Sequence, residues 1–84
     1  MPPKHSSTAF FKALGQAVRV ERERLHLSQE ELCHRADLDR TYLSGVERGV
    51  RSPNVRTLLK VADALGTKLS RLMLAAETLR EAER

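Results

Sequence analysis

Apolar residues recur every three to four positions along most of this 84-residue chain, the spacing that places them on one face of a helix. The first such stripe lies between residues 8 and 25, and Ser7 or Thr8 is expected to cap the backbone amides at its start. Its members are Phe10, Leu14, Ala17, Val18 and Leu25, with Arg22 on the same stripe. No segment alternates apolar and polar residues with the period of two that marks a half-buried strand. The pattern predicts an all-α fold.

Two short helices joined by a tight turn are predicted next. Ser28 and Glu31 have the spacing of a capping box, and Asp37 tolerates the left-handed backbone of a turn. Asp39 is expected to cap the third helix and Gly49 to end it. The inner positions are Leu32, Cys33, Ala36, Leu43 and Val46. This is the layout of a helix-turn-helix, in which the second helix of the pair enters the major groove of DNA.

The last part of the chain predicts two further helices. Asn54 is expected to cap the fourth helix and Gly66 to close it, with an inner stripe of Val55, Leu58, Leu59, Ala62 and Leu65. A fifth helix is expected over about residues 69–82. Its apolar residues occupy more than one face of the helix. This is more apolar surface than one small core can bury, so one stripe is expected to form a dimer interface. That stripe comprises Leu69, Leu72, Met73, Ala76 and Leu79.

The length suits a single domain, expected over residues 8–84 behind a polar, flexible leader at residues 1–7. The single Cys33 cannot form an internal disulfide, and neither a signal-peptide pattern nor a long apolar run is present. We therefore expect a cytoplasmic protein without a membrane partner. The formal net charge of +4 favours a polyanionic partner, though only modestly.

The third predicted helix presents a polar face that suits the edges of DNA bases. Arg40 can donate two hydrogen bonds to guanine, and Thr41 offers a hydroxyl and a methyl group. Ser44 lies on the same side, and Gly45 lacks a side chain and is expected to let the helix approach DNA closely. These residues are candidates for base reading. The alternative is that they are ordinary solvated residues of a small helical bundle.

Residues around this face are candidates for phosphate contacts. Gln29 begins the second helix, where its backbone amide and side chain are placed to hold a phosphate. Tyr42, Arg48 and Arg51 stand at the edges of the face. The expected partner is double-stranded DNA.

The residue pattern resembles the xenobiotic-response-element family of helix-turn-helix regulators, to which phage repressors and Cro proteins belong. The resemblance covers roughly residues 14–73, and residues 38–49 look most like the controller proteins of restriction–modification systems. It implies a five-helix, lambda-repressor-like DNA-binding domain with its helix-turn-helix at helices two and three, dimeric on a palindromic operator. The residues that carry it are Arg22, residues 27–32, Ala36, residues 43–44 and 46–49, Pro53 and residues 58–66.

The resemblance also implies roles for single residues. Phosphate contacts are implied for Gln29 and Tyr42, base contacts for Arg40, Thr41 and Ser44, and a second DNA-contacting arginine at Arg51. Arg22 and Glu47 fall where the family buries an ion pair; the alternative is two separate exposed charges. Two departures stand out: the turn usually holds Gly where this chain has Asp37, and the cap of helix five is usually Ser or Thr where it has Lys68.

Other classes of function find little support. Cys33 and the three His residues lack ligand spacing on a shared helix face, so no metal site is expected. Neither a carboxylate pair nor a Gly-rich phosphate loop indicates an enzyme, and no cofactor or small-molecule ligand is expected. An antitoxin that binds a toxin as well as DNA remains the main alternative, although only residues 75–84 follow the domain. A defective prophage repressor fragment is a third.

Overall fold

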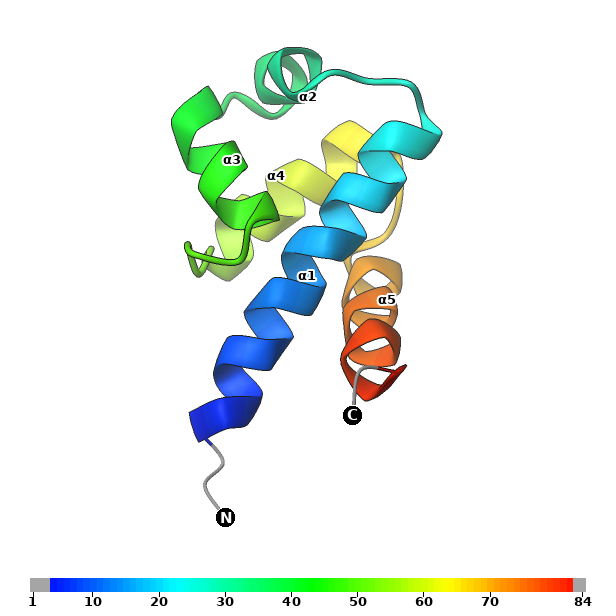
Figure 1. Cartoon of the computed structure of the whole chain (residues 1–84). Helices are drawn as coiled ribbons and strands as arrows, with labels where there is room; N and C mark the ends of the chain where they lie inside the picture. Colours follow the sequence, from blue (N-terminus) through cyan, green and yellow to red (C-terminus); the bar gives the residue numbers. More distant parts are fainter. Residues whose placement is uncertain (1–3, 83–84) are drawn as a thin grey trace.

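The computed structural model describes residues 4–82, and these residues form helices without any strand. The five helices are α1 (Lys4–Arg24), α2 (Gln29–Ala36), α3 (Arg40–Glu47), α4 (Val55–Leu65) and α5 (Leu69–Ala82). Helix α3 packs against both α1 and α2, and α5 packs alongside α1 more extensively than any other pair of helices does (Figure 1). The predicted all-α class and the helix-turn-helix at α2 and α3 are confirmed.

Local signals in the sequence fix both ends of α2 and the start of α3. The backbone N–H of Glu31 donates to Ser28 Oγ at 3.0 Å, and the N–H of Ser28 donates to Glu31 Oε1 at 2.7 Å, which completes the capping box. These hydrogen bonds from Ser28 hold the pKa of the exposed Glu31 carboxyl below its usual value. Asp37 takes the left-handed conformation with φ +55°, and Asp39 caps α3 by accepting from the Tyr42 N–H at 3.2 Å. The predicted turn is therefore confirmed.

The first helix begins earlier than the sequence pattern indicates. It starts at Lys4, whereas a start at Ser7 or Thr8 was predicted, so part of the expected leader is helical. Residues 1–3 of that leader lie outside the described residues.

The core is built around the inner side of α1 and the facing sides of the other helices. Its largest fully buried side chains are Leu14, Val18, Leu32, Leu43, Val46 and Val61. The predicted inner stripe of α4 is wrong at two positions, because Val55 and Leu59 are 69% and 49% exposed while Val61 is buried. Two neighbouring stripes of α4 fit helical spacing equally well, and packing against α2 and α5 selects the one that contains Val61.

The apolar stripe of α5 is not surplus surface. Leu72 and Ala76 are buried in the monomer core, and Leu69, Met73 and Leu79 pack against the same core. Leu72 and Ala76 are therefore not available for the expected dimer interface, whereas Leu69, Met73 and Leu79 are half-buried and their part in a dimer stays a prediction. The large apolar side chain that α5 leaves in solvent is Leu74, at 63% exposed.

Helix α3 rests against α1 at a backbone-to-backbone contact. A Cβ atom at Gly15 of α1 would lie 2.1 Å from the carbonyl oxygen of Val46 and 2.6 Å from that of Glu47. Only glycine fits this contact. Gly15 therefore sets how closely α3 is held.

No helix among residues 4–82 combines the length and the apolar character needed to cross a membrane.

Candidate nucleic-acid interface

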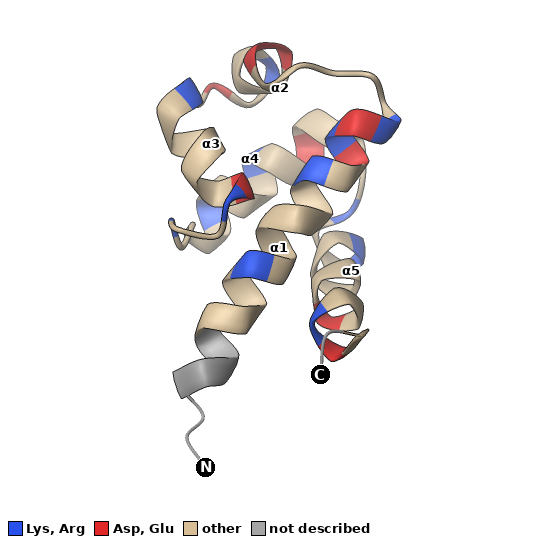
Figure 2. Ribbon diagram, viewed as in Figure 1, with Lys and Arg blue, Asp and Glu red and all other residues tan. Residues whose placement is uncertain are grey.

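Helix α3 is anchored on one side and presents polar residues on the other. Leu43 and Val46 are fully buried, whereas Arg40 and Thr41 are exposed and Ser44 is half-buried. Basic residues lie at the start of α3 and in the chain that follows it, and the acidic residues next to α3 are Asp39, which caps it, and Glu47, which is buried (Figure 2). The exposed side of α3 is therefore polar, flanked by positive charge and open to a large partner.

A buried ion pair joins α3 to α1. The Arg22 Nε and Nη2 atoms donate to the two carboxylate oxygens of Glu47 at 2.7 and 3.0 Å. Arg22 Nη1 donates to the Leu27 carbonyl oxygen at 2.8 Å. The bond to Glu47 raises the pKa of the Arg22 guanidinium, which stays charged. Both residues are 8% exposed, and every buried side-chain nitrogen or oxygen in the described part of the chain has a hydrogen-bond partner.

Gln29 extends this cluster to α2. Its side-chain Nε2 donates to Glu47 Oε1 at 2.9 Å, a contact that the sequence pattern did not predict. The Gln29 side chain is thus partly engaged inside the protein, and its phosphate contact would rely on the backbone amides at the start of α2. Nothing local in the sequence signals this bond, because the two residues are 18 positions apart.

Gly45 is not at the exposed surface, which corrects its expected place on the base-reading face. It is buried, and the chain beyond α3 folds back over it. The N–H groups of Val50 and Arg51 both donate to the Gly45 carbonyl oxygen, at 2.9 and 3.2 Å. The Arg51 side chain covers the glycine, so that a Cβ atom at position 45 would lie 2.5 Å from Arg51 Cγ. The Arg51 side chain, and not the helix backbone, therefore forms the outer surface at this position.

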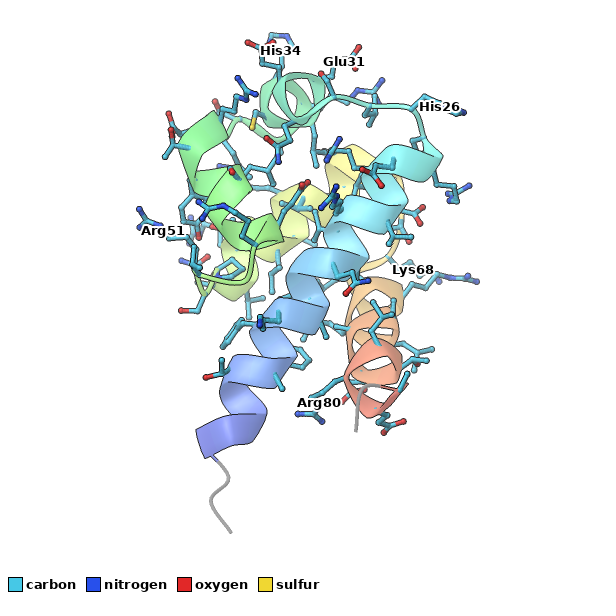
Figure 3. All side chains as sticks on the ribbon, viewed as in Figure 1. His26, Glu31, His34, Arg51, Lys68 and Arg80 are labelled. Carbon is cyan, nitrogen blue, oxygen red and sulfur yellow. The ribbon has the colours of Figure 1, made fainter. Side chains whose placement is uncertain are left out.

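The other expected contact residues lie around this position. The Arg51 Cζ atom lies 5.9 Å from the centre of the Tyr42 ring, in a cation–π arrangement. Arg51 projects outward beside α3 (Figure 3). Arg48 is also exposed, and its Nε donates weakly to Ser44 Oγ at 3.4 Å. The structure therefore gathers Tyr42, Ser44, Arg48 and Arg51 on or beside α3.

Other reactive groups are buried or dispersed. Cys33 is buried among apolar neighbours, and its burial raises the pKa of the thiol. Within residues 4–82, no three His, Cys, Asp or Glu side chains gather closely enough to hold a metal ion.

Comparison with known proteins agrees with this arrangement. Residues 18–72 match the helix-turn-helix family model HTH_3. The chain is 40% identical over 55 residues to the control protein C.BamHI of Bacillus amyloliquefaciens, which covers 64% of this chain and 68% of that protein. It is 36% identical over 69 residues to an uncharacterized HTH-type transcriptional regulator of Mycobacterium tuberculosis, covering 82% of this chain and 49% of that protein.

A solved structure shares both sequence and fold. The restriction–modification controller protein C.AhdI from Aeromonas hydrophila superposes with a TM-score of 0.73 at 40% sequence identity, covering 74% of this chain and 94% of that one. The chain spans about half the length of three of the curated relatives it matches. The matched residues include α2, the turn and α3, and the chain therefore belongs to the HTH_3 helix-turn-helix family of XRE/Cro-like transcriptional regulators.

Proposed function

We propose that this protein is a sequence-specific regulator of transcription that binds double-stranded DNA as a homodimer on a palindromic operator. The observation that carries the proposal is the exposed polar side of α3, flanked by arginines and held in place by the buried Arg22–Glu47 pair. A helix of this kind fits the major groove, where donors and acceptors on base edges differ for each base pair.

The relatives support a restriction–modification context for this regulator. C.BamHI and C.AhdI are named as a control protein and a controller protein, and the second shares the fold over most of its length. A toxin-binding role ranks second, because the relatives are described as regulators, repressors and control proteins.

Arg40 is proposed to read a base, with Thr41 and Ser44 beside it. We expect Arg40→Ala to lose roughly 1–3 kcal/mol on the preferred site and to relax the preference at one position in each half-site. The measurement is selection of bound duplexes from a random pool, followed by titration on the selected site. If Arg40→Ala weakens binding equally on all sequences, then Arg40 contacts only phosphate.

Arg48 provides the matched control, since it is an exposed arginine at the opposite end of the same helix, where it forms the C-cap. Arg48→Ala should weaken binding to all sequences alike and lower the salt slope of log K by about one for each monomer. A wild-type protein that selects no duplex would overturn the proposed function itself.

A homodimer follows from the amount of sequence one helix can read. A single α3 contacts only a few base pairs, whereas two related by a twofold axis read half-sites about 34 Å apart. Because Leu72 and Ala76 are buried in the monomer, we propose that the contact is centred on the exposed Leu74 of α5, with the half-buried Met73 beside it.

We expect sedimentation over a concentration series to show a monomer–dimer equilibrium that Leu74→Glu shifts toward monomer. Leu59→Glu is the matched control, because Leu59 is an exposed leucine on α4 at 49% exposure. Dissociation by Leu59→Glu alone would move the interface to α4. A wild-type monomer at several hundred micromolar, without cooperative binding to palindromic DNA, would exclude the dimer.

A further inference from the structure

We propose that Gly45 and Tyr42 position Arg51 so that an arginine from the loop after α3 completes the DNA-reading face of that helix. This inference rests on the proposed DNA-binding function. It assigns Gly45 a positioning role and explains why a buried glycine stands in the middle of the recognition helix.

The backbone brings Arg51 back onto α3. The Gly45 carbonyl accepts hydrogen bonds from both Val50 and Arg51, at 2.9 and 3.2 Å. Gly49, with φ +80°, provides the left-handed residue that reverses the chain. Arg51 is therefore fixed beside the helix by its own backbone and does not hang from a free loop.

The missing side chain of Gly45 makes room for Arg51. Its helical backbone has an ordinary negative φ, so glycine is not required there by conformation. A Cβ atom would instead lie 2.5 Å from Arg51 Cγ and 3.5 Å from Arg51 Nε. Glycine is required at position 45 because the aliphatic part of the Arg51 side chain occupies the space that a side chain at position 45 would fill.

The Tyr42 ring then directs the far end of Arg51. Tyr42 lies one helical turn before Gly45, and its ring faces the Arg51 guanidinium at 5.9 Å. When a guanidinium stacks on an aromatic ring, the N–H groups at the edge of the guanidinium remain free to donate hydrogen bonds. Arg51 thus runs along α3 from Gly45 to Tyr42.

The test is a double-mutant cycle on the duplex that wild-type protein selects. Gly45→Ala should melt at the wild-type temperature or above, because alanine favours helix over glycine, yet bind the selected duplex roughly tenfold more weakly. Arg51→Ala should bind at least as weakly. The double variant should bind like Arg51→Ala alone, because the added Cβ then displaces nothing. Both single variants should lose preference at the same operator position.

Thr78→Ala on the exposed side of α5 is the control, since it raises helix propensity without touching Arg51. Its affinity should match wild type. Additive effects of Gly45→Ala and Arg51→Ala, or loss of preference at different positions, would overturn the inference while the DNA-binding function stands. Should Gly45→Ala melt below wild type, the double variant decides: its melting temperature recovers if Arg51 was the displaced group and stays low if it was not.

Discussion

The Glu47→Ala variant is expected to lose on the order of 3–5 kcal/mol of folding free energy. The substitution leaves the Arg22 guanidinium buried, with its side chain only 10% exposed and its one carboxylate partner removed. Gln29 loses its acceptor at the same time. A small domain has a total stability of about 5–15 kcal/mol, so much of the population should be unfolded at moderate temperature.

The measurement is denaturation followed by circular dichroism, with Glu23→Ala as the matched control. Glu23 pairs with Arg19 at 3.2 Å, but both side chains are more than half exposed, at 54% and 62%. Solvent screening limits that pair to about 0–1 kcal/mol. A double replacement of Arg22 and Glu47 by apolar residues of similar volume should recover much of the loss. A melting temperature of Glu47→Ala equal to that of the wild type would show that the Arg22 guanidinium is solvated by water in the variant.

Gly15→Ala is expected to be nearly as damaging, at about 3 kcal/mol or more, for the opposite reason: it adds an atom where none fits. The new Cβ would overlap the carbonyl oxygens of Val46 and Glu47, which belong to backbone and cannot rotate away. Helix α3 must therefore shift away from α1, and the geometry of the ion pair must change with it.

Gln16→Ala, on the next residue and exposed, is the matched control and should leave stability unchanged. DNA binding should fall in Gly15→Ala even at temperatures where the protein remains folded, because α3 is displaced. Unchanged stability and affinity together would mean that α1 and α3 lie farther apart than described. Gly45→Ala should cost less stability than Gly15→Ala, because the atom that obstructs a Cβ at position 45 belongs to a side chain, which can move.

Local chemistry accounts for the parts of the fold that the sequence predicts well. Ser28, Asp37 and Asp39 act on backbone groups within three or four residues of themselves, so their signals survive any tertiary arrangement. The stripes of α4 and α5 depend on which helix packs against them, and spacing alone does not separate neighbouring faces. The spacing accordingly predicts Leu59 in the core, where the structure exposes it, and Leu72 on a free surface, where the structure buries it.

The candidate site shows the same division. The exposure of Arg40 and Thr41 follows from helical periodicity within α3. The burial of Gly45 does not, because it results from a loop six residues farther along the chain that returns to cover it. The bond from Gln29 to Glu47 is likewise a product of tertiary packing.

The single carboxylate of Glu47 also governs how the protein meets a partner. It accepts bonds from α1 and α2 while belonging to α3, so none of the three helices can pivot without breaking a charge-assisted contact. The orientation of α3 relative to the start of α2 is thus settled during folding. Association with a duplex then requires little further ordering of the backbone, and the entropic cost of docking is confined to exposed side chains and loops. Such a preorganised domain should bind DNA without changing its own backbone conformation. Its selectivity for base sequence should then depend on a few long arginine side chains.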